Sequence, residues 1–274
     1  MPVTVAHVLY TPTVPCATSF SVVTRCQLEL FIYAPTSGGP WPLIVAVTGG
    51  PVSKVSDEGD PDGFGRSLAG QGAVFIGAWY RENIDTDGGY PVTFQDIACA
   101  IGVARRIGPT YKADPARVTL LGYSFGGWAG AVVALTPTPF TPDPGSCNPT
   151  SGSLRPDAFV GLDGAYTVAQ DTSAFELQVP SVYANEATRA AAAAASDPYL
   201  LAKKYPAGAG SIPILLLQGT ADEAVTVDVP TSFESALTAA GYHSSLWMVP
   251  GADHMSVLSA DSTFAWILAF AKGT

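Results

Sequence analysis

The pentapeptide Gly-Tyr-Ser-Phe-Gly, residues 122–126, places a serine between two glycines. An apolar strand is expected before it, over residues 117–122, and an apolar helix directly after it, over residues 125–135. A strand-to-helix turn this tight strains the serine backbone, lifts the hydroxyl above the sheet and leaves no room for side chains two residues away. The first N–H groups of the helix also favour negative charge nearby. Ser124 is therefore the candidate nucleophile.

A serine hydroxyl needs a base to take its proton, and the chain offers three histidines. His254 follows a predicted strand, residues 245–251, and so lies at the same carboxyl edge of a parallel sheet as Ser124. His243 comes before that strand, at the wrong edge, and His7 lies near an N-terminal strand. We therefore expect His254 to be the base.

The imidazole in turn needs a carboxylate that orients it and stabilises its charged form. Asp222 follows the predicted strand of residues 212–219, and its rival Asp163 ends the strand before that one. Glu223 and Asp253 are interpreted as charges on solvent-facing loops. Asp222 completes the order Ser, Asp, His with each member just after a strand, although a turn cap would also explain this residue.

Two backbone N–H groups are expected to bind the oxyanion of a tetrahedral intermediate. Phe125, the residue after the nucleophile, supplies one of them. The second is expected from the loop Val-Thr-Gly-Gly-Pro, residues 47–51, where Pro51 has no N–H. The donor is then Gly50 or Gly49, and Gly50 is the predicted one. An ordinary glycine turn is the alternative interpretation.

Strands alternate with helices along the chain, which predicts βαβ units and a mostly parallel sheet with helices on both faces. The expected strands are residues 27–35, 42–50, 72–80, 117–122, 157–164, 212–219 and 245–251. The expected helices are residues 93–108, 125–135, 231–241 and 262–272. The first strand alternates as an antiparallel edge strand does, and Thr93 and Asp96 form a capping-box-like start of the first helix.

Two segments interrupt the alternation. Residues 136–157 are rich in Pro, Thr and Ser and are expected to form a long surface loop. Residues 165–211 contain an alanine-rich stretch and are expected to be partly helical, either as a small lid-like insertion or as ordinary packed helix. The domain prediction is a single unit over residues 1–274.

Composition excludes some classes of function. The 274 residues are 47% hydrophobic and only 13% charged, as in a globular protein with a sizeable core. The net charge of −10 argues against nucleic acid or an anionic membrane surface as partner. No apolar run reaches the roughly 18 residues of a membrane span, and no signal peptide is evident. The compartment stays open between secreted and cytoplasmic.

Four cysteines, at positions 16, 26, 99 and 147, lack CxxC spacing, so a zinc or thioredoxin-type site is unsupported. Four cysteines allow three disulfide connectivities. A Cys16–Cys26 pair across an N-terminal hairpin is the preferred one, and four reduced thiols packed as small hydrophobes are the alternative.

The chain resembles the α/β-hydrolases from about residue 28 onward, and more narrowly their carboxylesterase and feruloyl-esterase-like branch, which is related to the prolyl-oligopeptidase catalytic domain. The stretches that carry the resemblance are LIVAVTGG, WYR, FQDIACAIGVARR, DPARVTLLGYSFGG, PILLLQGTADEAV and GADH. It implies an α/β-hydrolase fold and the same five site residues as above. Two positions depart from the family pattern: Thr48 replaces the usual histidine of the oxyanion loop, and Pro51 replaces its third glycine.

These features predict a serine esterase that cleaves small carboxylic esters through an acyl-enzyme, with no metal or organic cofactor. Four residues are expected to line the substrate pocket: Gly49, Trp79, Trp128 and Tyr166. A serine peptidase on the same fold would use the same triad, and a non-catalytic binding protein is the alternative from a different class. The expected partner is a small ester, with neither nucleic acid nor a membrane span involved. Oligomeric state stays open.

Overall fold

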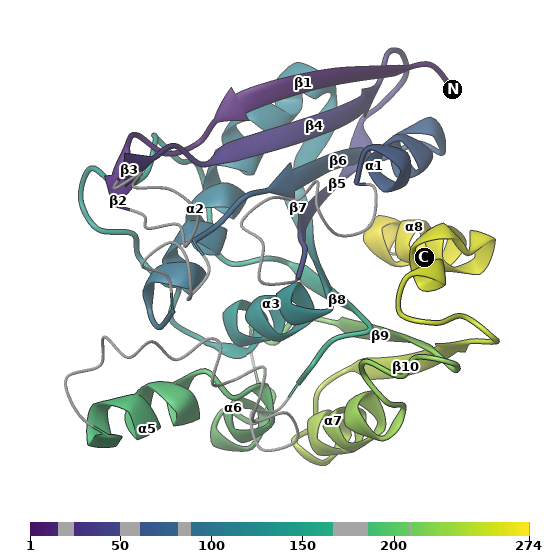
Figure 1. Cartoon of the computed structure of the whole chain (residues 1–274). Coiled ribbons are helices and arrows are strands. Elements are labelled where there is room, and N and C mark those ends of the chain that lie inside the picture. Colours follow the sequence, from purple (N-terminus) through teal and green to yellow (C-terminus); the bar gives the residue numbers. More distant parts are fainter. Residues whose placement is uncertain (16–24, 50–60, 82–88, 167–185, 209, 274) are drawn as a thin grey trace.

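An eight-stranded sheet runs through the whole molecule (Figure 1). The computed structural model describes residues 1–15, 25–49, 61–81, 89–166, 186–208 and 210–273. The strands of the sheet are β1 (Val3–Leu9), β4 (Glu29–Pro35), β5 (Trp41–Val47), β6 (Val74–Ala78), β7 (Ala113–Tyr123), β8 (Ala158–Leu162), β9 (Ile214–Gly219) and β10 (Ser244–Val249). Their spatial order is β1-β4-β6-β5-β7-β8-β9-β10. Only β4 pairs antiparallel with its neighbours, so the sheet is mostly parallel as predicted.

Helices cover both faces of this sheet, as expected. On one side lie α1 (Pro61–Gly70) and α8 (Asp261–Lys272), which pack on β4, β5 and β6. On the other side lie α2 (Val92–Ile107), α3 (Phe125–Leu135), α6 (Pro198–Lys204) and α7 (Asp228–Ala239). The remaining elements are α5 (Glu186–Ala195), η1 (Gly108–Tyr111), η2 (Ser256–Ser259) and the short strands β2 (Val14–Pro15) and β3 (Arg25–Cys26).

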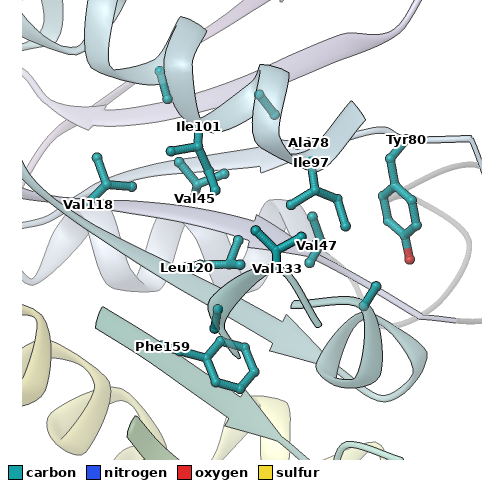
Figure 2. Packing of buried hydrophobic residues seen from close by; sticks show 14 of the residues in the cluster. Val45, Val47, Ala78, Tyr80, Ile97, Ile101, Val118, Leu120, Val133 and Phe159 are labelled. Carbon is teal, nitrogen blue, oxygen red and sulfur yellow. The ribbon is translucent and has the colours of Figure 1, made fainter. Parts of the chain in front are cut away.

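Two hydrophobic cores follow from the alternation of side chains along each strand. In β5, Val45 and Val47 belong to the core under α2 and α3, whereas Ile44 points into the core under α1 and α8. Figure 2 shows Ile97 and Ile101 of α2 above the β5 valines. Because apolar side chains occupy both faces, the central strands are continuous apolar runs, and this is the pattern that predicted them.

The antiparallel end of the sheet differs from the prediction. Residues 27–35 were expected to be an edge strand, but β4 lies between β1 and β6 and pairs with both. The edge strand is β1, whose side chains alternate between exposed and partly buried. The edge prediction was wrong because the N-terminal strand near His7 pairs antiparallel with the full length of β4 and takes the outer position.

Helix α1 was not predicted, and its glycines explain why. Gly65 lies where a Cβ would approach the Tyr33 ring to 2.6 Å and the Phe75 ring to 2.9 Å. Glycine therefore lets α1 pack closely on β4 and β6, while Phe64 and Leu68 bury their side chains. A helix with low intrinsic propensity is stabilised here by tertiary packing.

The capping box expected at Thr93 and Asp96 is wrong. No side chain caps α2, which begins after Pro91. Asp96 instead accepts two hydrogen bonds of 2.8 Å from the guanidinium of Arg81, and the Thr93 hydroxyl donates to the Arg81 carbonyl at 2.7 Å. Both side chains thus connect the end of β6 to α2, a contact between segments that no local sequence pattern describes.

Residues 136–157 contain no regular helix or strand, as predicted for a long loop. A Cys99–Cys147 disulfide links this loop to α2 across 48 residues. The alternative of four reduced thiols is therefore wrong for this pair. The predicted N-terminal hairpin is present, with Val14 opposite Cys26, but Cys16 lies outside the described residues and its pairing with Cys26 stays a prediction.

The described part of residues 165–211 holds α5 and α6, in agreement with the expected helix content. α6 packs against α3 and α7. Residues 167–185 and 209 lie outside the described residues, so the lid-like role of this segment stays a prediction. Within the described ranges, no helix is both long and apolar enough to span a bilayer.

Candidate active site

The serine turn has the strained geometry that its glycines indicate. Ser124 lies between β7 and α3 with φ 55° and ψ −122°, a backbone conformation that non-glycine residues rarely adopt. A Cβ at position 122 would lie 2.2 Å from the Gly126 carbonyl oxygen, and one at position 126 would lie 2.2 Å from that of Val47. Both positions must therefore be glycine. The backbone N–H of Ser124 donates to Leu162 at 2.9 Å, which fixes the turn against β8.

His254 reaches the serine from the loop after β10. Its Nε2 lies 2.9 Å from Ser124 Oγ, although the two residues are 130 positions apart. The Tyr123 hydroxyl donates to the His254 carbonyl oxygen at 2.7 Å, and the two rings lie 5.1 Å apart. Tyr123 thus contacts the loop that carries His254, and the sequence analysis did not single this residue out. The only local signal was its place between Gly122 and Ser124 in the motif.

Asp222 holds the other side of the imidazole. Its Oδ2 lies 2.7 Å from His254 Nδ1, while its Oδ1 accepts from the backbone N–H groups of Ala224 (2.8 Å) and Val225 (2.9 Å). Gln218 Nε2 donates to Oδ2 at 3.3 Å, another contact that the sequence did not reveal. Burial raises the pKa of Asp222, but the hydrogen bonds from His254 and from these backbone groups outweigh it and lower that pKa overall.

Asp163, the rival acid, lies beside the same histidine. Its side chain is fully buried at the end of β8, and its Oδ1 accepts from the Gly219 N–H at 2.7 Å. Its Oδ2 lies 3.9 Å from His254 Nδ1, too far for a hydrogen bond. Burial, with the nearby charge of Asp222 adding to it, raises the pKa of Asp163 to about 8. The structure therefore puts Asp222, not Asp163, within hydrogen-bond distance of the imidazole.

The loop after β5 lies directly against Ser124. A Cβ on Gly49 would approach the Phe125 nitrogen to 2.3 Å and Ser124 Cβ to 2.8 Å, so only glycine fits there. The Tyr80 hydroxyl donates to the Thr48 carbonyl at 2.6 Å and holds this loop from β6. Gly50, the predicted second oxyanion donor, lies outside the described residues.

The other candidates lie apart from this cluster. His7 is exposed on the edge strand β1, with its ring 4.4 Å from that of Phe31, and His243 is exposed just before β10. Glu223 is exposed, as interpreted from the sequence. Asp253 is also exposed, and its Oδ1 accepts from the N–H groups at the start of η2.

Asp163, Asp222 and His254 are also the one group in the described ranges with three potential metal-ligating side chains close together. Their ligand atoms lie within 4.8 Å of one another. However, both ring nitrogens of His254 are already in hydrogen-bond contact, one with Asp222 and one with Ser124. This geometry is that of a Ser-His-Asp hydrogen-bond chain, and it accounts for Asp222 and His254 without a metal ion.

Residues 30–237, about three quarters of the chain, match the BD-FAE family model. The chain belongs to the BD-FAE family. The matched range contains Ser124 and Asp222, whereas His254 lies beyond it. No curated protein matches the chain.

Several of the solved structures similar to this BD-FAE family member are of proteins named as esterases. A truncated carbohydrate esterase from gut microbiota has a TM-score of 0.66 at 18% identity, over 97% of this chain and 96% of that one. Propionate-bound esterase of the Planctomycetes species Thermogutta terrifontis has 0.65 at 22%, over 97% and 92%. The T. terrifontis esterase 2 phosphorylated by paraoxon has 0.64 at 20%, over 95% and 92%. At these identities the likeness shows the fold, which is the predicted α/β-hydrolase fold.

The three aromatic residues expected to line the pocket of this BD-FAE family member have different surroundings. Trp128 is buried in α3, with its ring 4.9 Å from that of Phe125. Tyr166 is buried and stacks on Phe233 of α7 at 4.5 Å. Trp79 is partly buried, 5.0 Å from the ring of Phe31. Trp128 is therefore the aromatic residue in contact with the nucleophile's neighbour, and a lining role for all three stays a prediction.

Proposed function

We propose that this protein is a serine esterase of small carboxylic esters, with Ser124 as nucleophile, His254 as base and Asp222 as the orienting acid. The observation that carries the proposal is the unbroken contact from Asp222 through both ring nitrogens of His254 to Ser124 Oγ, at 2.7 and 2.9 Å. A base within hydrogen-bond reach of a nucleophile, itself oriented by a carboxylate, is the arrangement that activates a serine hydroxyl.

The reaction follows from these contacts. Ser124 Oγ attacks the ester carbonyl carbon while His254 Nε2 takes the hydroxyl proton, and Asp222 stabilises the imidazolium that forms. The same proton then passes from His254 to the departing alcohol, which leaves an acyl group on Ser124. Water then attacks the acyl carbon while giving a proton to Nε2, and this proton passes to Ser124 Oγ as the bond between Oγ and the acyl carbon breaks and the acid leaves. Each step uses side chains and N–H groups of this chain, so the proposed reaction calls for no cofactor or metal.

The negative charge of the tetrahedral intermediate develops next to the start of α3. Phe125 N–H is the first proposed donor, because it follows the nucleophile directly and heads the helix. Gly50 N–H is the proposed second donor, supported by the close packing of its neighbour Gly49 on Ser124. A donor of this kind is worth about 3–4 kcal/mol in comparable enzymes.

Ester hydrolysis is favoured over peptide hydrolysis and over a non-catalytic role. The similar solved structures are of esterases, and one carries a phosphoryl group from paraoxon, a reagent that modifies active serine hydrolases. A binding protein on this fold would have no need of a complete triad, and all three members are in contact here. A short acyl group is proposed for the substrate, in keeping with the propionate bound by the T. terrifontis esterase.

Hydrolysis of p-nitrophenyl acetate, butyrate, octanoate and palmitate tests the proposal. We expect turnover of the short esters, and we expect Ser124→Ala to reduce kcat by about 10⁴-fold or more. Ser235→Ala, which changes an exposed serine on α7, is the matched control and should keep wild-type rates. Paraoxon should add one phosphoryl group to the wild type but not to Ser124→Ala, as measured by intact mass. A wild type inert on all four esters and unlabelled by paraoxon would refute the esterase proposal.

A further inference from the structure

Two carboxyl groups, not one, face the imidazole of His254. Asp163 and Asp222 follow adjacent parallel strands, β8 and β9, and their carboxyl oxygens lie on the same side of the ring. The Nδ1–O distances are 2.7 Å to Asp222 and 3.9 Å to Asp163. Asp163 Oδ2 is buried and accepts no hydrogen bond from a donor among the described residues, while burial raises the pKa of Asp163 and the Asp222 carboxyl group raises it further by its charge and by a side-chain hydrogen bond. A buried carboxyl oxygen that accepts no hydrogen bond is uncommon and calls for a functional explanation.

The number of hydrogen-bond donors explains which carboxyl group carries the charge. Asp222 accepts from Ala224 N–H and Val225 N–H and from the Gln218 amide in addition to His254. Asp163 accepts only from Gly219 N–H in the described structure. Two carboxyl groups this close do not ionise together easily, so the group with more donors holds the negative charge and the other keeps its proton.

We propose that Asp163 is a reserve acid of the triad: a positioning residue that keeps its proton beside ionised Asp222 and that, once the Asp222 carboxylate is removed, ionises and accepts the His254 Nδ1–H through Oδ2. This inference rests on the esterase function proposed above. The required movement is small, because Oδ2 is 1.2 Å further from Nδ1 than the Asp222 oxygen is (3.9 against 2.7 Å). The Gly219 N–H fixes the other oxygen of Asp163, so the carboxyl group is already oriented.

The groups around Asp163 determine when it can take this role. Three titratable side chains face it: Asp222 from the loop after β9, His254 from the loop after β10, and Tyr166 just after β8. The charge of Asp222 raises the pKa of Asp163, and a protonated His254 lowers it. Tyr166 adds no charge, because burial, reinforced by Asp163 itself, raises its pKa further above neutrality. Removing the Asp222 carboxylate therefore makes Asp163 easier to ionise.

The test compares four proteins on p-nitrophenyl butyrate: wild type, Asp222→Ala, Asp163→Asn and the double variant. Asp222→Ala removes the first acid and leaves space for the ring to approach Asp163. Asparagine at position 163 keeps an oxygen for Gly219 N–H and tolerates the positive φ of 44° found there. A reserve acid predicts that Asp222→Ala loses about 10²–10³-fold in kcat/KM and that the double variant loses a further tenfold or more, reaching the roughly 10⁴-fold typical of a triad without its acid.

A pH profile separates this role from a structural one. The ratio of the Asp222→Ala rate to the double-variant rate should rise with pH, because only the single variant still has a carboxyl group that ionises beside His254. Asp222→Ala/Glu223→Gln, which changes the exposed neighbour of Asp222, is the matched control and should stay at the Asp222→Ala level.

The possible outcomes are distinct. The reserve role would be overturned by equal rates for Asp222→Ala and the double variant, or by a ratio of these rates that does not change with pH. The esterase function would still stand in that case, because it depends on the wild-type and Ser124→Ala rates. A wild type without activity would overturn the proposed function itself. Thermal unfolding of each variant identifies any that fails to fold, and in that case Asp222→Asn replaces Asp222→Ala in the same comparison.

Discussion

The turn after β8 and the turn after β9 present the same side chain to the same histidine but give it different properties. Each ends a buried parallel strand with a buried aspartate, and both carboxyl groups lie within reach of the His254 ring. The β9 turn continues into a loop whose N–H groups point at Asp222, whereas the β8 turn supplies no donor to one oxygen of Asp163. Position at a strand end therefore selects candidates, and the donors around each carboxyl group decide which one is ionised.

The two turns also depend on each other through Gly219. Its N–H donates to Asp163, and a Cβ at this position would lie 2.5 Å from the Ala252 carbonyl oxygen in the loop that carries His254. The same residue thus orients the second carboxyl group and allows the histidine loop to approach. Three measurements test how the two turns differ and how far they depend on each other.

Gly219→Ala should have the largest effect, because the added methyl group must move the His254 loop. A displacement of about 1 Å in catalytic geometry can lower the rate roughly 100-fold, and we expect a loss of that size in kcat/KM. Gly208→Ala, where a Cβ would meet nothing within 4 Å, is the matched control and should keep wild-type kinetics. Unchanged kinetics for Gly219→Ala would show that the two turns and the histidine loop adjust independently.

The pH dependence of stability should distinguish the two carboxyl groups next. The pKa of Asp163 is raised from about 3.9 in an unfolded chain to about 8 in the folded protein, mainly by burial. The folded state therefore holds a proton that the unfolded state releases, so stability falls as pH rises from about 4 to 8. Asp163→Asn has no carboxyl group at this position and so lacks this loss of stability. Its melting temperature relative to wild type should rise by about 3 °C or more between pH 5 and pH 9.

For Asp222 the pH dependence of stability has the opposite sign. Its lowered pKa contributes stability that is present above the unfolded pKa of about 3.9 and is lost as pH falls through the folded value. Asp114→Asn, at an exposed position, provides the baseline for both comparisons. A constant difference in melting temperature between Asp163→Asn and wild type across this pH range would mean that Asp163 is ionised in the folded protein.

Gln218→Leu should have the smallest effect, because it removes one of several donors to Asp222. The Gln218 amide also donates to the Val225 carbonyl at 2.8 Å, so the loop that supplies the Asp222 N–H groups loses one support. We expect kcat to fall about fivefold. We also expect the acidic limb of the pH–rate profile to move to higher pH, because the Asp222 carboxylate loses a hydrogen-bond donor. Steady-state kinetics from pH 5 to 9 measure this, with the exposed Gln71→Leu as control. A larger loss than that of Gly219→Ala would show that the Gln218 contacts matter more to the site than the close approach of the His254 loop at Gly219.

Helices whose limits depend mainly on the local sequence were predicted closely. Helix α3 begins and ends at the predicted residues 125 and 135, and α2 lies within one residue of its predicted range. The glycines around Ser124 were interpreted correctly, because backbone contact within one turn requires them whatever the rest of the fold does. The failures involve partners far away in the chain: Asp96 pairs with Arg81 rather than capping its own helix, and glycine-rich α1 forms because β4 and β6 are there to pack on.

By itself, the sequence determined that a serine, an aspartate and a histidine would meet at the carboxyl edge of a parallel sheet, since strand order and period place each one just after a strand. It also limited the acid to two residues, Asp163 and Asp222, but the difference between them was visible only in three dimensions. Their distances to Nδ1 differ by little more than 1 Å, and the donors that separate them belong to a folded loop. Such differences arise from how distant segments pack, and no periodicity in the chain encodes them.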